Sequence, residues 1–263
     1  MIDSWQALIL ALIQGLSEFL PISSSAHLVL PSQLLGWPDQ GLAFDVAVHF
    51  GSLLAVMFYF RTDIARVVVG GFGSLVGRWN DDAQLAWMLV LATIPAGLAG
   101  LIFDDFIEAN LRTTDVIAIT TIAGGLLLLA ADRNGGGSKT LADLTWGLVL
   151  LIGLAQVLAL VPGTSRSGIT ITMALFLGLA RTEAARFSFL MSVPIILLSA
   201  VWMSKDLIGE VEVVWSIFAI GIVASGLSAY ACIAAFIAVL DKIGMLPFVV
   251  YRVILGLCLL LVF

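Results

Sequence analysis

Long apolar stretches dominate the chain, and most are close to the length that crosses a lipid bilayer. A membrane-spanning helix needs about 20 mostly apolar residues, with few charges at mid-depth. The hydropathy pattern predicts six such spans, at roughly residues 42–60, 86–103, 115–131, 187–204, 212–232 and 246–263. The pattern therefore predicts an all-α polytopic membrane protein.

Two further apolar regions are interrupted by polar residues and helix breakers. These are Glu18, Pro21, Ser23–Ser25 and His27 in region 5–36, and Pro162–Gly163 and Arg166 in region 144–180. Interrupted segments are tolerated at membrane depth only where protein or a water-filled cavity satisfies the freed backbone groups. We therefore predict that each region forms a re-entrant helix pair.

A polar linker at residues 132–143 divides the chain into two parts of the same order, repeat one at about 1–131 and repeat two at about 144–263. Each part has one interrupted segment followed by three spans. Both interrupted segments place a glutamine (Gln14 or Gln156) before a proline and a run of hydroxyl residues. Because three is odd, the second part must enter the membrane from the opposite face. This inverted-repeat pattern predicts one membrane domain with a site near the midplane.

Basic residues are concentrated in the loop 61–85 and in the central linker, whereas loops 104–114 and 205–211 carry one basic residue each. The positive-inside rule makes the basic side cytoplasmic, so the first interrupted segment and both termini are expected outside. The start of the chain lacks a basic n-region and an A-x-A cleavage site, so we expect the first apolar segment in the mature protein.

The composition agrees with a body made of spans. Of the residues 61% are hydrophobic and 11% are charged, against about 25% charged in a typical soluble domain. The formal net charge of −6 argues against binding nucleic acid, which normally requires a basic face. Cys232 and Cys258 lie in apolar runs without a metal-type or redox-type spacing, so we interpret them as small hydrophobic residues.

The first polar constellation spans Gln14 to His27. Gln14 and Glu18 are four residues apart and share one helix face. After Pro21, freed backbone N–H groups and the serine hydroxyls form a natural anion site. A carboxylate in lipid costs a few kcal/mol on insertion scales, so Glu18 needs a functional or structural reason. The structural alternative is helix capping with a satisfied hydrogen-bond network.

The second constellation places Arg166 after Pro162–Gly163 and among hydroxyl residues, namely Thr164, Ser165, Ser167 and Thr170. A guanidinium forms bidentate bonds to phosphate, so this pattern indicates an oxyanion clamp. The structural alternative is an arginine that extends its charge to the headgroups.

Together the two constellations favour phosphoryl transfer, which needs charge neutralisation, an aligned nucleophile and proton transfer. The candidate phosphate-binding residues are Ser23, Ser165, Arg166, Ser167 and Thr170. Glu18, with Gln14 as a second candidate ligand, could hold a divalent metal, Mg²⁺ or Ca²⁺. His27 and Ser24 are both candidate nucleophiles, and His27 could also act as acid or base. His49 could line the cavity, but we favour its interpretation as a packed, hydrogen-bonded residue.

A transporter or lipid flippase is the rival class, because inverted repeats with broken helices are commoner among transporters. Phosphate release from a lipid diphosphate separates the two classes.

Four runs closely resemble the undecaprenyl-diphosphatase family, also called the bacitracin-resistance family: QGLSEFLPISSSAH, PGTSRSGIT, RTEAARFSFLMSVP and YRVILG. The resemblance covers essentially the whole chain. It implies hydrolysis of undecaprenyl diphosphate to undecaprenyl phosphate and inorganic phosphate at the outer face of the bacterial plasma membrane. This reaction recycles the lipid carrier of peptidoglycan synthesis and confers bacitracin resistance. By similarity, the family's functional positions are Glu18, Ser24, His27, Ser165, Arg166 and Thr170.

One position departs from the resemblance. Many members have a second glutamate where this chain has Gln14, so this motif does not offer a two-carboxylate metal site. Either Glu18 suffices with water and phosphate ligands, or the substrate mainly holds the metal. The sequence leaves open whether the protein is a homodimer and which prenyl length it prefers.

Overall fold

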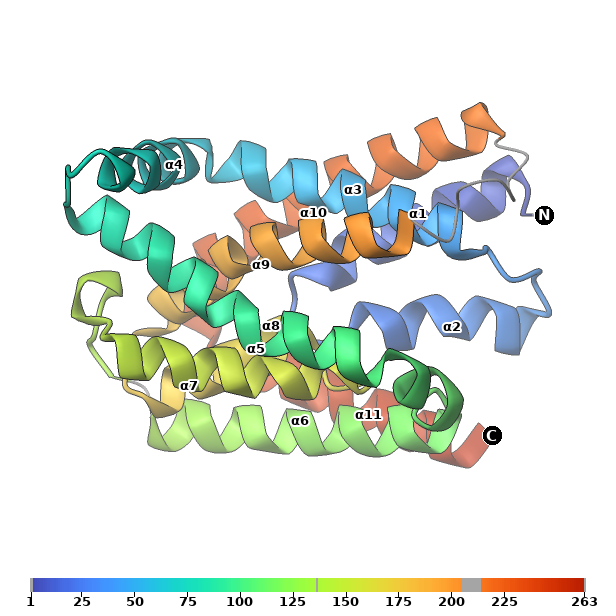
Figure 1. The fold of residues 1–263 in the computed structure, drawn as a ribbon. Helices are drawn as coiled ribbons and strands as arrows, with labels where there is room; N and C mark the ends of the chain where they lie inside the picture. The colour runs from blue at the N-terminus through green and yellow to red at the C-terminus, as the bar shows by residue number, and fades with distance from the viewer. Residues whose placement is uncertain (1, 136, 205–213, 263) are drawn as a thin grey trace.

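The computed structural model describes residues 2–135, 137–204 and 214–262, and this part of the chain is built from helices (Figure 1). In chain order they are α1 (Ser4–Glu18), α2 (Ser24–Leu35), α3 (Leu42–Tyr59), α4 (Arg61–Leu75), α5 (Asp81–Asn110), α6 (Thr114–Asn134), η1 (Leu141–Asp143), α7 (Trp146–Val157), η2 (Leu158–Leu160), α8 (Arg166–Phe176), α9 (Arg181–Ser204), α10 (Trp215–Ile243) and α11 (Leu246–Val262).

Five of the described helices are long and apolar enough to cross a membrane: α3, α5, α6, α9 and α10. They correspond to five of the six predicted spans. The sixth, α11, is an apolar helix of 17 residues, which at about 1.5 Å per residue is slightly shorter than a hydrocarbon core of about 30 Å. The protein is therefore an all-α, multi-pass membrane protein. The loop 205–211 lies outside the described residues.

The prediction of a loop at residues 61–85 is wrong, because Arg61–Leu75 forms the helix α4. Its charged residues stand in the first two turns, and the remainder is largely apolar. The predicted linker is also partly ordered as helix, since α6 continues to Asn134 and η1 occupies Leu141–Asp143. The Thr140 backbone N–H and hydroxyl donate to Asp143, and these bonds lower the pKa of that carboxyl.

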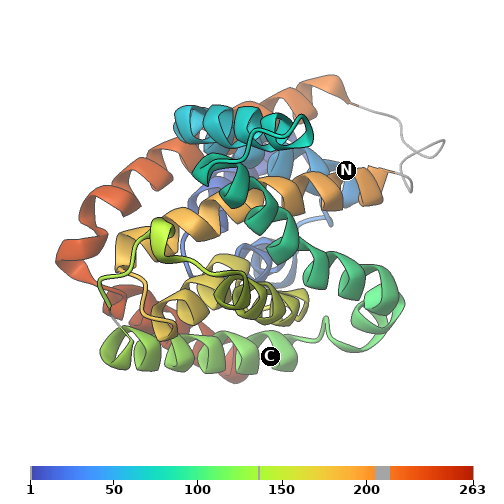
Figure 2. The ribbon, with the colours of Figure 1, turned by 60° about the vertical axis from the view of Figure 1, so that its left-hand side comes forward.

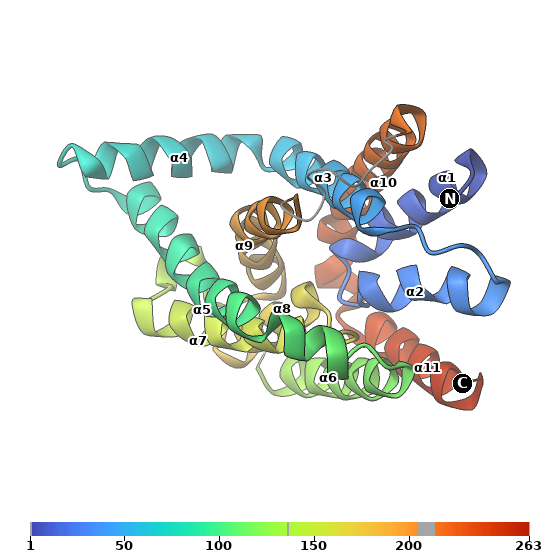
Figure 3. The same cartoon turned by 45° about the vertical axis from the view of Figure 1, so that its right-hand side comes forward.

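Figure 1 shows both chain termini at one end of the bundle and α4 with the connection from α6 to α7 at the other. Figure 2, turned so that the α4 end comes forward, and Figure 3 show α4 and α6 at opposite edges with α9 between them. The helices α1 and α2 lie together at the end of the termini. Between these layers lies an apolar core whose larger members include Phe19, Phe187, Phe189, Ile152, Ile171 and Leu175.

Candidate active site

The carboxylate of Glu18 is the centre of the site and stands at the last residue of α1. Gln14, one turn earlier, donates from Nε2 to Glu18 Oε2 at 3.0 Å. Ser24, the first residue of α2, donates its hydroxyl to the same oxygen at 2.7 Å. Pro21 lies between the two helices, so the break in the chain brings the serine back against the carboxylate. A hydroxyl and a potential base are thus already within hydrogen-bond distance.

Arg166, the first residue of α8, reaches Glu18 from the second half of the chain. Its Nη2 donates to Glu18 Oε1 at 2.8 Å, and its Nη1 donates to the Ser188 carbonyl at 3.4 Å. The guanidinium carbon lies 5.9 Å from the centre of the Phe19 ring. Only 14% of the Arg166 side chain and 7% of the Glu18 side chain are exposed. The pair is therefore buried, and each charge depends on the other.

The hydroxyl residues around Arg166 hold the backbone of this region. Ser165 caps α8 by accepting from the Gly168 N–H at 3.1 Å, and Ser167 donates to the Leu20 carbonyl at 2.9 Å. The Thr170 and Ser188 hydroxyls lie 2.7 Å apart. The structure thus gathers Ser165, Ser167 and Thr170 near Arg166, with hydrogen bonds directed largely into the protein.

The two chain breaks share an unusual backbone conformation. Ser23 and Ser165, each directly before a helix, have φ of 72° and 69°. Each serine also has its Oγ 3.2 Å from the hydroxyl two residues later, Ser25 or Ser167. Non-glycine residues rarely adopt positive φ, and such strain concentrates at functional sites.

His27 is held by contacts that do not include Glu18. Its Nδ1 lies 2.6 Å from the Ser23 carbonyl and its Nε2 lies 2.5 Å from the Tyr251 hydroxyl. The His27 and Tyr251 rings are stacked, 5.5 Å apart and 6° from parallel. Because a carbonyl oxygen only accepts, Nδ1 carries the proton, and in the neutral ring Nε2 accepts from Tyr251.

Sequence reasoning did not single out two side chains near the site, Tyr251 and Arg252. A third, His49, has its Nδ1 2.7 Å from the Asp45 carbonyl and its Nε2 3.8 Å from Glu18 Oε2, so it is hydrogen-bonded, as interpreted, and also lies beside the carboxylate. Arg252 is fully buried in α11. A charge inside an apolar run is a functional-site candidate by default, and this signal could have identified Arg252.

A divalent metal has a limited donor set here. In the described ranges, no group of three or more His, Cys, Asp or Glu side chains could hold a metal. Gln14 Oε1, however, is buried without a hydrogen-bond partner in the part of the chain that the structure describes. The amide nitrogen of the same side chain contacts the Glu18 carboxylate, so Gln14 and Glu18 are the candidate oxygen ligands for an ion that would take its other ligands from phosphate and water.

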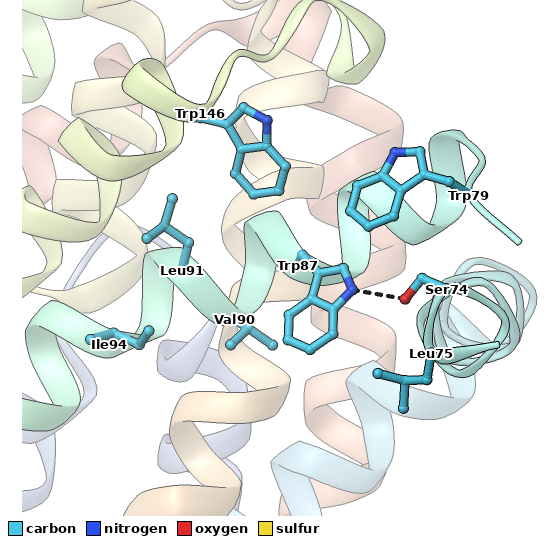
Figure 4. A pocket seen from close by; sticks show the side chains of 8 residues that line it. All are labelled: Ser74, Leu75, Trp79, Trp87, Val90, Leu91, Ile94 and Trp146. Carbon is cyan, nitrogen blue, oxygen red and sulfur yellow. Dashed lines mark hydrogen bonds between the residues drawn. The ribbon is translucent and has the colours of Figure 1, made fainter. Parts of the chain in front are cut away.

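A separate hollow of about 600 Å³ shares no residue with this polar cluster (Figure 4). It is lined by Ser74, Leu75, Trp79, Trp87, Val90, Leu91, Ile94 and Trp146, and the indole N–H of Trp87 donates to Ser74 Oγ at 2.9 Å. Tryptophans of this kind typically lie at the membrane–water interface. The polar cluster around Glu18, not this apolar hollow, is the candidate active site.

A family model described as bacitracin resistance protein BacA matches residues 7–258 of the chain. The undecaprenyl-diphosphatase of Teredinibacter turnerae is 57% identical over 97% of this chain and 97% of its own length. That of Alcanivorax borkumensis is 59% identical over 98% of both chains, and that of Saccharophagus degradans is 56% identical over 97% of this chain and 96% of its own.

Proposed function

The chain belongs to the BacA family of bacitracin resistance proteins, and from this membership and the site geometry we propose that it hydrolyses undecaprenyl diphosphate to undecaprenyl phosphate and inorganic phosphate. Relatives that match almost the whole chain are named undecaprenyl-diphosphatases. The observation that carries the proposal is the buried Glu18–Arg166 pair with the Ser24 hydroxyl 2.7 Å from the same carboxylate. The protein is thus a membrane-bound hydrolase that recycles the lipid carrier.

Ser24 is the nucleophile that the contacts favour over His27. Its hydroxyl already donates to Glu18, whereas His27 Nε2 is occupied by the Tyr251 hydroxyl. In the first step Ser24 Oγ bonds to the terminal phosphorus and the P–O bond to undecaprenyl phosphate breaks, while Glu18 takes the serine proton. Water then attacks the phosphoserine phosphorus and the Ser24 Oγ–P bond breaks, so inorganic phosphate leaves. Glu18 returns its proton to Ser24 Oγ, and His27 takes the proton that the water loses.

Arg166 neutralises charge on the phosphate that is attacked. In the free protein its guanidinium is bound to Glu18. A phosphate group offers several anionic oxygens in the geometry that a guanidinium prefers. When Arg166 turns to the phosphate, Glu18 Oε1 loses this hydrogen bond. The hydroxyls of Ser23, Ser165, Ser167 and Thr170 complete the proposed phosphate site.

A divalent ion, Mg²⁺ or Ca²⁺, is proposed to bind at Glu18 and Gln14 Oε1. When bound, the ion supplies further neutralisation of the diphosphate. Chelation with EDTA should lower phosphate release from the purified protein at least tenfold, and added Mg²⁺ or Ca²⁺ should restore it. Phosphate release that is unchanged after exhaustive chelation would contradict the metal site.

Six crossing helices, α3, α5, α6, α9, α10 and α11, form the proposed membrane body, with α1–α2 and α7–α8 as re-entrant pairs. The equal spacing of Gln14 from Ser23 and of Gln156 from Ser165, together with the shared positive φ, supports an inverted repeat. The end of the bundle that holds α4 and the connection from α6 to α7 carries the basic residues of 61–85 and of the central linker, and it is proposed to be cytoplasmic. The site then opens to the outer face of the bacterial plasma membrane.

Replacement of Arg166 with alanine tests the proposed function. The purified wild type should release phosphate from undecaprenyl diphosphate in detergent, and Arg166→Ala should lose at least about 1,000-fold in kcat/KM, the range for a transition-state arginine. Arg186→Ala is the matched control, because Arg186 pairs with Asp63 and Glu183, neither of which is a proposed site residue.

Retained turnover in folded Arg166→Ala would contradict the assignment of Arg166. A wild type that moves the lipid across liposomes without releasing phosphate would instead identify a flippase.

A further inference from the structure

Arg252 is the largest fully buried side chain of the described residues and lies in the middle of α11. Its guanidinium donates to five backbone carbonyls. Nε binds Thr121 at 2.9 Å, Nη1 binds Pro21 at 3.2 Å, and Nη2 binds Thr120, Gly163 and Thr164 at 3.3, 3.1 and 2.9 Å. All three guanidinium nitrogens thus donate, and Nη2 shares its two N–H groups among three carbonyls.

Three of these five carbonyls belong to the two chain breaks of the active site, and the other two belong to α6. Pro21 lies between Glu18 and Ser24 in the first break, and Gly163 and Thr164 directly precede Ser165 and Arg166 in the second. Carbonyls set free where a helix is broken inside an apolar region need a donor from elsewhere in the protein. Arg252 supplies that donor for the two breaks at once and also binds them to α6.

The neighbouring helix leaves room for the guanidinium. A Cβ on Gly124 of α6 would lie 3.0 Å from Arg252 Cζ and closer still to Nη2, and a Cβ on Gly125 would lie 3.1 Å from Arg252 Cβ. A larger residue at position 124 would therefore displace the group that joins the breaks.

Stability alone does not explain this arginine. No carboxylate in the described ranges pairs with it, so the buried cation is balanced only by carbonyl dipoles. Taking an uncompensated charge out of water is costly, and a well-packed apolar side chain of similar volume is often at least as stabilising. What an apolar side chain lacks is the ability to hold two irregular segments at one distance.

We propose that Arg252 is a positioning residue of the active site: by binding both breaks it sets the distance between the Glu18–Ser24 side and the Arg166 side. This inference rests on the proposed phosphatase function. A displacement of about 1 Å between reacting groups can lower turnover about 100-fold. Arg252 itself binds the backbone oxygens of the breaks and of α6.

The test compares wild type, Arg252→Lys and Gly124→Ala in phosphate release from undecaprenyl diphosphate. Lysine keeps the charge, but its single nitrogen cannot replace the three nitrogens of the planar guanidinium that bind five carbonyls. Alanine at position 124 keeps Arg252 and displaces it. Both variants should lose about 100-fold in kcat with a smaller change in KM, while monodisperse elution and helix content stay those of the wild type.

Arg181→Lys is the matched control, because Arg181 binds Asp132 at the far end of α6 and does not contact either break. It should keep wild-type kcat. A folded Arg252→Lys or Gly124→Ala protein with wild-type kcat overturns the inference. So does failure of both to fold, which would assign Arg252 to folding alone. A wild type that releases no phosphate refutes the proposed function instead, and the two failures are therefore distinguishable.

Discussion

Both nitrogens of the His27 ring are engaged, and this decides what the residue can do. Nδ1 donates to the Ser23 carbonyl, and Nε2 meets the Tyr251 hydroxyl. For Nε2 to attack phosphorus, the Tyr251 hydroxyl would have to move away. The Ser24 hydroxyl has no such obstacle, since its partner Glu18 is the group that would take its proton.

Replacing Tyr251 with phenylalanine separates the two roles proposed for His27. The variant keeps the stacked ring and loses the hydroxyl. Because the proposed His27 transfers protons through this contact, kcat of the variant should fall about tenfold, as expected for one hydrogen bond of about 1.4 kcal/mol. Tyr230→Phe, in an aromatic cluster with Phe58 and Tyr59, is the control. A rise in kcat would contradict the assignment, because it would indicate that Tyr251 blocks a nucleophilic His27.

At the scale of single elements, the starts of α2 and α8 are the notable features. Each helix begins after a serine with positive φ, and only Ser165 recovers a capping hydrogen bond. Ser23 therefore carries backbone strain without a cap. The strained turn is followed directly by Ser24, whose hydroxyl donates to Glu18.

Substitution of Ser23 by glycine should stabilise the protein and reduce its activity. Glycine adopts positive φ without a steric cost, so the free energy of unfolding should rise by about 1 kcal/mol, while loss of the hydroxyl should lower phosphate release. Ser23→Ala is the matched variant, since it removes the same hydroxyl and keeps the strain. Equal melting temperatures for the two variants would show that the φ of 72° stores no strain.

Close contact between α3 and α10 depends on Gly51. A Cβ at this position would overlap the Ser225 side chain and the Ile222 carbonyl of α10, and small residues at such contacts let membrane helices approach. Gly51→Ala should lower stability by about 1–3 kcal/mol, the usual cost of overpacking. Gly147→Ala is the control, because a Cβ there meets nothing within 4 Å. Thermal unfolding in detergent measures both, and equal melting temperatures would contradict the close contact.

At the scale of the whole molecule, the site exists only because two distant halves meet. The Glu18–Arg166 pair joins residues 148 positions apart, and Arg252 binds both breaks from α11. The halves are alike in their broken helices but contribute different groups to the site. The first half contributes the Glu18 carboxylate and the Ser24 hydroxyl, and the second contributes the Arg166 guanidinium.

Cysteine labelling tests the proposed orientation. In a background with Cys232 and Cys258 changed to serine, Pro38→Cys should react with an impermeant maleimide added to spheroplasts, and Arg78→Cys should react only after lysis. Both positions are exposed, one beyond α2 and one beyond α4. The reverse labelling pattern would place the site at the cytoplasmic face.

The sequence by itself determined the membrane environment, most of the spanning helices and the positions of the two chain breaks. A run of about 20 apolar residues has few stable alternatives in lipid to a helix, so five predicted spans reappear as α3, α5, α6, α9 and α10. Pro21 and Pro162, each followed by a run of hydroxyl residues, identified both breaks, because proline cannot donate the backbone hydrogen bond that continues a helix. The helix α4 was missed because its charges resembled those of a loop.

Only the tertiary structure decided which polar groups are partners. In a hydropathy pattern, Tyr251 and Arg252 are only polar positions within an apolar run. The pattern cannot show that Arg252 binds both breaks or that Tyr251 binds His27. It likewise cannot state that His49 lies beside Glu18. These contacts depend on how the helices pack, which is set by matching side-chain shapes across the bundle and not by any local pattern.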